Sequence, residues 1–402
     1  MTAAPVFRFW PVALAAAAIL MITNGVRTSF GLFIAPIDAA TGIGIADISL
    51  ALAFAQLTWG AVQPVAGAFS DRYGAARVLV TGCFLLIGGV ALAPLLPSAF
   101  GLILTIGILA SLGAGIGSFS VLLGAAAHQL PPNRQGLASG FINAGSSFGQ
   151  FLFAPLAQAL ITLLGWRGAM WSMALIGLAM LPLIRVLGGS TPHQSQPSPP
   201  GGLRRAVAEA LADRSYLLLH ASFFTCGFHI AFLITHLPGE VNLCGLPATV
   251  ASWSLAIIGL SNIFGSLAAG WWVGRYRSKY ILFWMYASRA VAILIYLALP
   301  RTDLNFYLFA AAIGFSWLAT VPPTARLVSK LFGTRYLATL FGLTLLTHQI
   351  GGFFGAWLGG LSRVGFGDYQ WMWYADIVLA LLAALANLPI RENRPLPAAA
   401  PA

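Results

Sequence analysis

The chain of 402 residues is 59% hydrophobic and only 8% charged, with a mean hydropathy of +0.85. Soluble domains carry about a quarter charged residues, so this composition excludes a water-soluble globule. The formal net charge of +11 does not indicate a nucleic-acid partner, because the Lys and Arg residues are spread between apolar segments and do not form one basic surface.

Apolar segments of about 20 residues or more, the length that crosses a hydrocarbon core, recur along the whole chain. The pattern predicts an all-α membrane protein with twelve transmembrane helices. We expect these helices near residues 9–36, 47–70, 77–96, 99–128, 137–164, 168–187, 215–237, 248–274, 280–300, 305–326, 336–362 and 369–390.

The basic residues lie mainly in alternate loops of this twelve-helix arrangement. Most of the 21 Lys and Arg residues fall on the side that holds both ends of the chain. The positive-inside rule therefore predicts that both termini are cytoplasmic, and we expect a multi-pass protein of a bacterial cytoplasmic (inner) membrane. The first apolar segment is too long for a signal-peptide core, so we expect it to be retained.

Cysteine spacing and catalytic motifs offer no sign of a cofactor, a metal centre or an enzyme. Cys83 and Cys226 fall inside predicted helices and Cys244 falls in an outer loop, with no CxxC spacing. The chain has no HExxH or Walker A motif. We therefore expect neither catalysis nor a bound cofactor.

A Pro/Ser-rich segment at the middle of the chain predicts a division into two halves. Residues 1–187 form the expected N-terminal six-helix bundle, residues 188–214 a cytoplasmic linker, and residues 215–392 the C-terminal bundle, followed by a cytoplasmic tail at 393–402.

Short motifs recur in the two predicted halves at offsets of about 202 residues. Examples are Gly67 and Gly270, Arg134 and Arg335, and the Met-Trp pairs at 170–171 and 372–373. A repeat that keeps its orientation predicts two pseudo-symmetric bundles around an axis along the membrane normal, with a substrate site between them near the midplane.

The loop after the second predicted helix resembles the inner-gate motif of the major facilitator superfamily. The matching residues are Gly67, Asp71, Arg72, Gly74 and Arg77, with one residue inserted before the last of them. Glycines at such a position allow close helix contact, and the arginines can bind cytoplasmic headgroups. The resemblance implies a secondary transporter with the major facilitator fold.

A narrower resemblance, to monocarboxylate transporters and oxalate/formate antiporters, rests on three segments. They are Arg134-Gln-Gly-Leu-Ala138, Gly165-Trp166-Arg167-Gly168 and Gly367-Asp368-Tyr369. The family carries an Asp and an Arg in its eighth helix that bind substrate carboxylate. Here the corresponding region, 259–266, has no charge.

Polar side chains at membrane depth need a partner, a water-filled cavity or a function. Asn24, Arg27 and Thr28 share one face of the first predicted helix by their spacing. The family resemblance aligns Arg27 with a Lys of monocarboxylate transporters, which implies a substrate or proton role. The alternative is a structural Arg whose side chain reaches the outer headgroups.

A polar stripe on the seventh predicted helix contains Ser222, Thr225, His229 and His236. The repeat offset relates His229 to Arg27, so we expect these two residues to face each other across the pseudo-two-fold axis. The alternative is a histidine that serves only helix packing.

Further candidates lie on predicted helices that flank the central cavity in this superfamily. They are Asn143, in a row with Ser147 and Gln150, and His348 beside Gln349. His229 and His348 are the candidates for proton coupling, because histidine titrates near physiological pH.

Arg289 and Asp376 lie well inside predicted outer helices of the second half. Two interpretations remain open for Arg289: a buried pair with Asp376, or a contact with a substrate carboxylate.

The buried charges therefore favour an anion, since cation exporters generally need a central carboxylate. We expect a monomeric transporter of a small organic anion, most simply a carboxylate, by proton symport or anion exchange. The alternative is efflux of a hydrophobic or zwitterionic compound.

Overall fold

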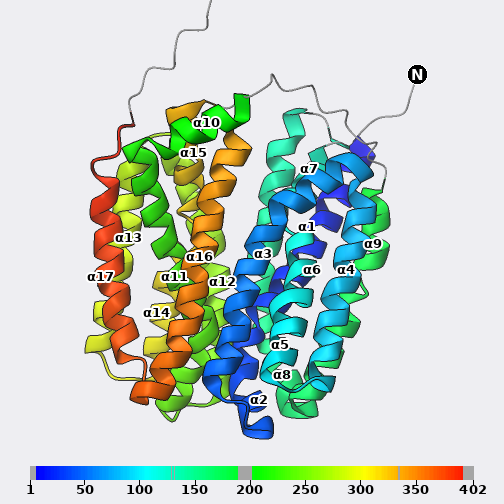
Figure 1. Cartoon of the computed structure of the whole chain (residues 1–402), viewed down its shortest axis with the longest axis vertical. Helices are drawn as coiled ribbons and strands as arrows, with labels where there is room; N and C mark the ends of the chain where they lie inside the picture. The colour runs from blue at the N-terminus through cyan, green and yellow to red at the C-terminus, as the bar shows by residue number, and fades with distance from the viewer. Residues whose placement is uncertain (1–5, 128, 131, 189–201, 334–335, 393–402) are drawn as a thin grey trace, which may run out of the picture.

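The computed structural model describes residues 6–127, 129–130, 132–188, 202–333 and 336–392. Within these ranges the regular elements are helical and no strand occurs. Two groups of helices stand side by side, an N half before the linker and a C half after it (Figure 1). Residues 189–201 of the predicted linker and the predicted tail 393–402 lie outside the described residues.

The N half contains long helices interrupted by short 3₁₀ and π segments. They are α1 (Val6–Thr28), η1 (Phe30–Phe33), α2 (Ile34–Thr41), α3 (Ile45–Tyr73), α4 (Ala75–Leu92), η2 (Ala93–Leu95), α5 (Ala99–Leu102), η3 (Ile103–Ala110), α6 (Ser111–Ile116), α7 (Phe119–Ala127), α8 (Pro132–Gly177) and α9 (Met180–Leu187).

The C half begins with a short helix that lies across the end of the bundle (Figure 1). Its helices are α10 (Gly202–Leu211), α11 (Arg214–Leu243), α12 (Ala248–Val273), α13 (Ser278–Ala298), α14 (Asp303–Ser316), α15 (Val321–Phe332), α16 (Leu337–Phe366) and α17 (Gln370–Asn387). We call the end of the molecule that carries α10 the linker end.

Nine stretches of the described residues are long and apolar enough to cross a membrane. One of them, Ala138–Leu187, holds two helices, because Gly165 has a φ of 69° and interrupts α8. Two further long helices, α16 and α17, carry polar residues such as His348 and Asp376 that lower their hydropathy. The described helices are thus compatible with the predicted twelve crossings.

Glycines allow α16 to pack tightly against two neighbours at once. A Cβ on Gly351 would lie 2.0 Å from the carbonyl oxygen of Phe224 on α11, and one on Gly355 would lie 2.2 Å from that of Phe228. On another face, a Cβ on Gly360 would meet Ser49 of α3 at 2.5 Å. Since the space exists only for glycine, α16 packs against its own half and against the N half at backbone distance.

The fourth and tenth predicted crossings are both broken near their middle. The former breaks at Gly117 and Ser118, between α6 and α7, and the latter between Ser316 and Val321, where Pro322 follows at once. Proline lacks the N–H that would continue the helix. The breaks lie about one repeat offset apart, so the two halves share this irregularity.

A buried carboxylate joins three segments at the linker end of the C half. Glu392 accepts hydrogen bonds from the backbone N–H groups of Ser278, at 2.9 Å, and Lys279, at 3.3 Å, where α13 begins. Lys330 of α15 donates to the same carboxylate at 2.7 Å. Burial alone would raise the pKa of Glu392, but these hydrogen bonds outweigh it and hold the pKa below the ordinary value.

We predict that Glu392→Gln lowers the stability of the folded protein by about 1 to 2 kcal/mol at neutral pH, the usual cost of losing a helix cap. Because the pKa of Glu392 is lower in the folded state, its ionised carboxylate stabilises the fold at pH values above the ordinary pKa of a glutamate. This stabilisation is lost as the pH falls through the lowered pKa. Thermal unfolding in detergent at several pH values measures both effects. Wild type and variant should converge in acid; a constant difference across the pH range would contradict the assignment.

Candidate substrate site between the two halves

The two halves meet along two seams, α3 against α16 and α8 against α12. Away from the linker end the contacts are close: a Cβ on Gly31 would lie 2.2 Å from the carbonyl oxygen of Ile234 on α11. Toward the linker end the seam helices carry Gly67, Gly140, Gly270 and Gly342, and a Cβ added to any of these would meet nothing within 4 Å. The halves are therefore in contact at one end and apart at the other.

Arg27 lies where the halves begin to separate. Its Nη1 donates to Gln56 of α3 at 2.8 Å, its Nη2 donates to Asn24 at 3.3 Å, and its guanidinium stacks over the Trp59 ring at 4.2 Å. Its buried Nε has no hydrogen-bond partner, and no carboxylate pairs with Arg27 in the described part of the chain. The side chain reaches α3 at mid-helix, so it does not extend along α1 to the outer headgroups.

The neighbours of Arg27 on α1 are held by backbone groups. Asn24 donates from Nδ2 to the carbonyl oxygen of Ser146 on α8 at 3.0 Å, which orients its Oδ1 toward Arg27. Thr28 is buried and donates to the carbonyl oxygen of Asn24 at 2.8 Å. Asn24 thus positions the guanidinium, whereas the Thr28 hydroxyl is engaged by its own helix.

The α8–α12 seam has polar contacts at Asn262 and at Gln150, whose Nε2 donates to the Leu255 carbonyl oxygen at 3.2 Å. The Asn262 side chain donates to Ser147 Oγ at 2.8 Å and accepts from the Leu318 N–H at 2.9 Å, so it joins the N half to the break after α14. Asn143 is partly exposed one turn before Ser147. It lies on the linker-end side of these seam contacts, where the halves have separated.

His348 is buried on α16, next to the other seam. Gln349 Nε2 and His348 Nδ1 are 3.1 Å apart, and the Gln349 side chain packs against Gly60 of α3. The His348 ring lies 5.0 Å from the Phe223 ring of α11. The histidine is therefore one residue removed from the seam and faces the interior of the C half.

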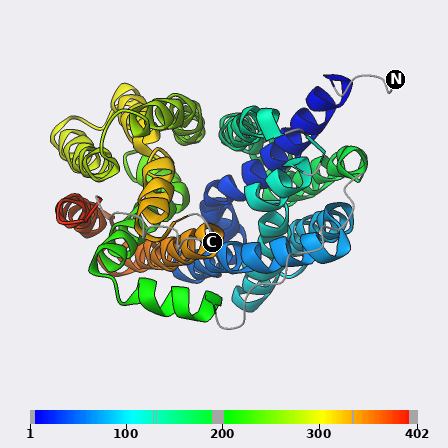
Figure 2. The same ribbon diagram turned by 90° about the horizontal axis from the view of Figure 1, so that it is seen from above.

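The structure does not place His229 opposite Arg27, and that expectation is wrong. The His229 Nε2 atom lies 3.4 Å from Asp376 Oδ1 of α17, inside the C half. Figure 2 shows α17 at the edge of the C half, away from the N half. Part of the polar stripe on α11 serves this interface, since Asn387 of α17 donates to Ser222 Oγ at 3.1 Å, whereas His236 Nε2 lies 2.6 Å from the Ala356 carbonyl oxygen of α16. A polar stripe shows that a helix face needs partners, but those partners can belong to the same bundle.

Arg289 is buried and holds the broken ends of the tenth crossing. Its Nε donates to Ser316 Oγ at 3.1 Å, and its Nη2 donates to the carbonyl oxygens of Ser316 and of Trp317, the latter at 2.8 Å. Its Nη1 lies 3.3 Å from Cys226 Sγ. Among the described residues, Arg289 forms no ion pair with Asp376. The salt bridge of Asp376 there is with His229. These contacts favour a structural role over a substrate contact.

The residues of the predicted inner-gate motif lie at the linker end, between α3 and α4. Gly74 has a φ of 88° and separates the two helices. Arg72 and Arg77 are exposed, and Arg72 lies over the Tyr73 ring at 5.3 Å. The side chain of Asp71 lies outside the described part of the structure. The exposed arginines can reach headgroups, as the motif predicts.

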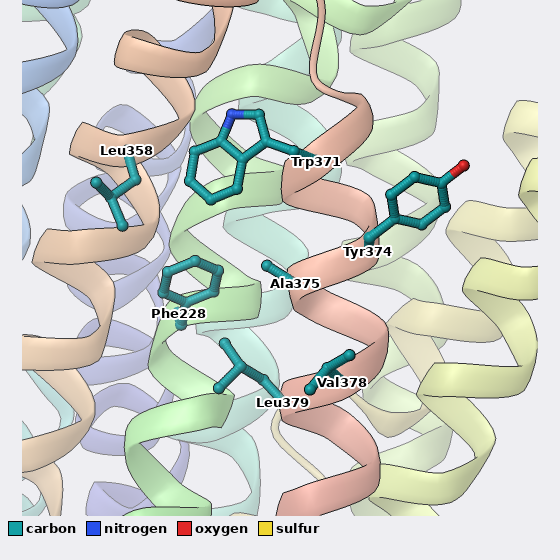
Figure 3. A pocket seen from close by; sticks show the side chains of 7 residues that line it. All are labelled: Phe228, Leu358, Trp371, Tyr374, Ala375, Val378 and Leu379. Atoms are coloured by element: carbon teal, nitrogen blue, oxygen red, sulfur yellow. The ribbon is translucent and has the colours of Figure 1, made fainter.

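An open groove on the outer face of the C half is apolar. It lies between α16 and α17 above Phe228, with Leu358, Trp371 and Leu379 on its sides (Figure 3). It offers no charged group, so it does not resemble a site for an anion. Among the described residues no group of three His, Cys, Asp or Glu side chains lies together as metal ligands either.

The sequence identified Arg27 but did not connect it with Gln56 or Trp59. Gln56 and Trp59 lie three residues apart on α3, hence on one face. That spacing next to a predicted buried cation was the available signal. The spacing of Gln56 and Trp59 does not by itself point to Arg27, because the two residues lie on a different helix and one sequence does not show which helices pair.

Two bundles with a polar site at their seam define a membrane transporter. A family model described as "Major Facilitator Superfamily" matches residues 14–356 and, in a second overlapping match, 245–401. The chain belongs to the Major Facilitator Superfamily, whose members are transporters and not enzymes.

Similar curated proteins are also transporters. The chain is 26% identical over 368 residues to monocarboxylate transporter 13 of Rattus norvegicus, covering 90% of this chain and 83% of that protein. It is 24% identical over 404 residues to the oxalate:formate antiporter of Oxalobacter formigenes, covering 96% and 93%.

Solved structures support the same fold. A D-xylose–proton symporter superposes with a TM-score of 0.73 at 16% identity, covering 95% of this chain and 97% of that one. A bacterial homologue of the lysosomal transporter Spinster, solved in an inward-facing and unoccupied conformation, has a TM-score of 0.70 at 14% identity, covering 95% of each.

We predict that Arg289→Gln destabilises the protein, because it removes donors from the carbonyl oxygens at a helix break within the membrane. Each buried polar group left without a partner costs about 1 to 3 kcal/mol, and Arg289→Lys should recover part of the loss. Thermal unfolding in detergent measures the effect, and Arg205→Gln, which changes an exposed arginine of α10, is the control. A substrate-binding Arg289 would instead give normal stability with weakened ligand binding.

Proposed function

We propose that the protein is a secondary transporter that moves a small organic anion, most simply a carboxylate, by alternating access. The observation that carries this proposal is Arg27, a cation at the seam that has no carboxylate partner among the described residues and keeps one donor unused. A buried unpaired charge is costly, and an anionic substrate removes that cost when it binds. The names of the monocarboxylate and oxalate:formate relatives support the same substrate class.

The proposed site has Arg27 at its centre. Gln56, Asn24 and Trp59 orient the guanidinium, and Asn143 is a candidate for a contact to the remainder of the substrate. A small recess beside Arg27, between Leu52 of α3 and Ile234 of α11, offers apolar walls. In this proposal Thr28 supports α1, and His229 and Arg289 act from inside the C half without touching the substrate.

We further propose that the linker end faces the cytoplasm, in an inner membrane, with the predicted bundles 1–187 and 215–392 as the two moving parts. The excess of Lys and Arg at that end supports this orientation. The present arrangement, with the seams apart at the linker end, is then the inward-facing state. Coupling by proton symport and by anion exchange are both compatible with Arg27 as the anion site.

We predict that Arg27→Gln weakens binding of the preferred acid roughly ten- to hundredfold, because a charge-assisted contact contributes about 1.5 to 3 kcal/mol. Arg27→Lys should retain part of the binding, since the charge remains but the two-pronged geometry is lost. Thermal shift of the purified protein with formate, acetate, lactate, pyruvate and oxalate measures both, because ligands raise the apparent stability of the folded state.

The control for the Arg27 variants is Arg205→Gln, which removes an exposed arginine of α10 from its ion pair with Glu209. This variant should bind as wild type does. Unchanged affinity in a well-folded Arg27→Gln would refute the anion site. Stabilisation by tetraphenylphosphonium but by none of the acids would favour efflux of a hydrophobic compound.

Closure of the linker end requires the seam helices to meet where they are now apart. Gly60 contacts Gln349 across the α3–α16 seam, and seven residues toward the linker end on each helix lie Gly67 and Gly342. A shift of seven residues keeps each residue on the same helix face. Gly67 and Gly342 therefore face the same seam, and their missing side chains leave room for close backbone contact.

We predict that Gly67→Cys and Gly342→Cys form a disulfide in membranes when the linker end closes, because a disulfide needs Cα atoms about 5.5 Å apart. A protease site inserted in residues 189–201 then tests the link, since only cross-linked halves stay together on a denaturing gel. The control pair, Gly67→Cys with Gly270→Cys, joins positions on different seams and should not cross-link. Equal cross-linking of the two pairs would contradict closure along these seams.

A further inference from the structure

A poorly satisfied acid–base pair is buried inside the C half. His229 and Asp376 face each other at 3.4 Å between Nε2 and Oδ1, and their side chains are 2% and 0% exposed. Neither ring nitrogen and neither carboxylate oxygen has a hydrogen bond of normal geometry within the described residues. Most buried polar groups are hydrogen-bonded, so four such atoms in one place require an explanation.

Ser222 and His236 of α11 differ from this pair because each makes at least one hydrogen bond to a neutral group. Ser222 pairs with Asn387, and His236 Nε2 lies 2.6 Å from the carbonyl oxygen of Ala356. The Ser222–Asn387 contact shows that α11 and α17 can pack through groups that do not titrate. At His229 and Asp376 the interface places a base beside an acid.

The ionisable neighbours of the pair come from three helices. Arg289 of α13 lies beside the pair, and Tyr286 of α13, Cys226 of α11 and His348 of α16 lie around Arg289 and Cys226. The facing part of the broken tenth crossing contributes neutral groups such as Ser316 and Thr320. Arg289 is close enough for its charge to act on both His229 and Asp376.

Charge balance gives this cluster two states. With Asp376 ionised and His229 neutral, the carboxylate offsets the Arg289 cation and the cluster has no net charge. One added proton, on either His229 or Asp376, leaves a net charge of +1. An uncompensated buried charge is costly. Whether a proton is bound to His229 or Asp376 therefore depends on the charges and water around them.

Polar side chains lead from this cluster to the seam. Arg289 contacts Cys226, and Cys226 is close enough to His348 to interact with it. His348 contacts Gln349, which packs on Gly60 of α3, one turn from Gln56 and its bond to Arg27. The pair is thus separate from the anion site but connected to the seam that must open and close.

We propose that His229 and Asp376 together bind one exchangeable proton, which is the coupling ion of the transport proposed above. The proton comes from water, binds a lone pair of the imidazole or the carboxylate, and returns to water in the other state of the cycle; no other bond changes. This inference rests on the proposed function for its role, whereas the existence of the proton site does not depend on Arg27.

Infrared difference spectroscopy between acidic and alkaline pH tests the site on the purified full chain without any substrate. We expect the wild-type spectrum to contain a carboxyl or imidazole signal that is lost in Asp376→Asn and in His229→Gln. The signal should persist in Ser222→Ala, which changes the same interface at a residue that does not titrate. Asp376→Glu keeps the carboxyl group, so it should retain a shifted signal if Asp376→Asn does not fold.

Acid binding measured by thermal shift on the same variants separates the two proposals. Asp376→Asn and His229→Gln should still bind the acid that wild type binds, and Arg27→Gln should lose acid binding but keep the proton signal. Acid binding that is unchanged in a well-folded Arg27→Gln would overturn the proposed function alone. A signal that is the same in wild type, Asp376→Asn and His229→Gln would overturn the proton site alone.

In vesicles containing a trapped pH indicator, addition of pyruvate as the probe should acidify the lumen with wild type. This coupled proton movement should fall at least tenfold in His229→Gln, whereas exchange of labelled for unlabelled pyruvate should continue. Proton movement at the wild-type rate in that variant would overturn the coupling role.

Discussion

Close backbone packing of α16 is the constraint on which the rest of the molecule depends. This helix lies between α11 of its own half and α3 of the other half, and glycines on two of its faces let both neighbours approach to backbone distance. Lipid supplies no hydrophobic force between helices, so such contacts must provide the attraction themselves. The position of α16 then sets the position of α3 and of the Gln56 and Trp59 side chains that hold Arg27.

The two buried arginines illustrate two ways of placing a cation within a membrane protein. Arg289 is surrounded by carbonyl oxygens, a hydroxyl and a thiol, which use its donors and satisfy a broken helix at the same time. Arg27 has an amide on each side and an aromatic face, which orient the guanidinium without neutralising it. The contrast indicates a structural role for Arg289, and it supports the proposal that Arg27 binds the substrate.

Much of the fold was predictable from the sequence because the bilayer imposes simple rules. The lengths of the apolar segments, the repeat offset and the Gly67–Arg77 motif together indicated the helices, the two halves and the superfamily. The family match confirms the superfamily. The break in the tenth crossing was also readable, since Pro322 and Pro323 stand in the middle of an apolar segment, but that segment was expected to be continuous.

The site was harder to predict, because one sequence gives the face of a helix and not the neighbour of that face. Arg27 was a sound candidate from its depth alone, whereas its partner Trp59 carries no distinguishing signal. The symmetry argument failed at His229 because a repeat relates backbone positions, while the direction of contact depends on the side chain and on the helices around it. Its true neighbour, Asp376, was expected as a possible partner of Arg289 and not of His229.

The two mid-membrane breaks have a consequence for how the fold bends. Each interruption is bridged by side chains of other helices: Thr23 of α1 donates to the Gly117 carbonyl oxygen at 3.1 Å, and Arg289 and Asn262 hold the break after α14. Side-chain bridges are exchanged more easily than a continuous helical ladder. The fourth and tenth crossings can therefore bend at these breaks more easily than a continuous helix bends. The breaks lie about one repeat offset apart, so a bend in one half can be matched by an equal bend in the other.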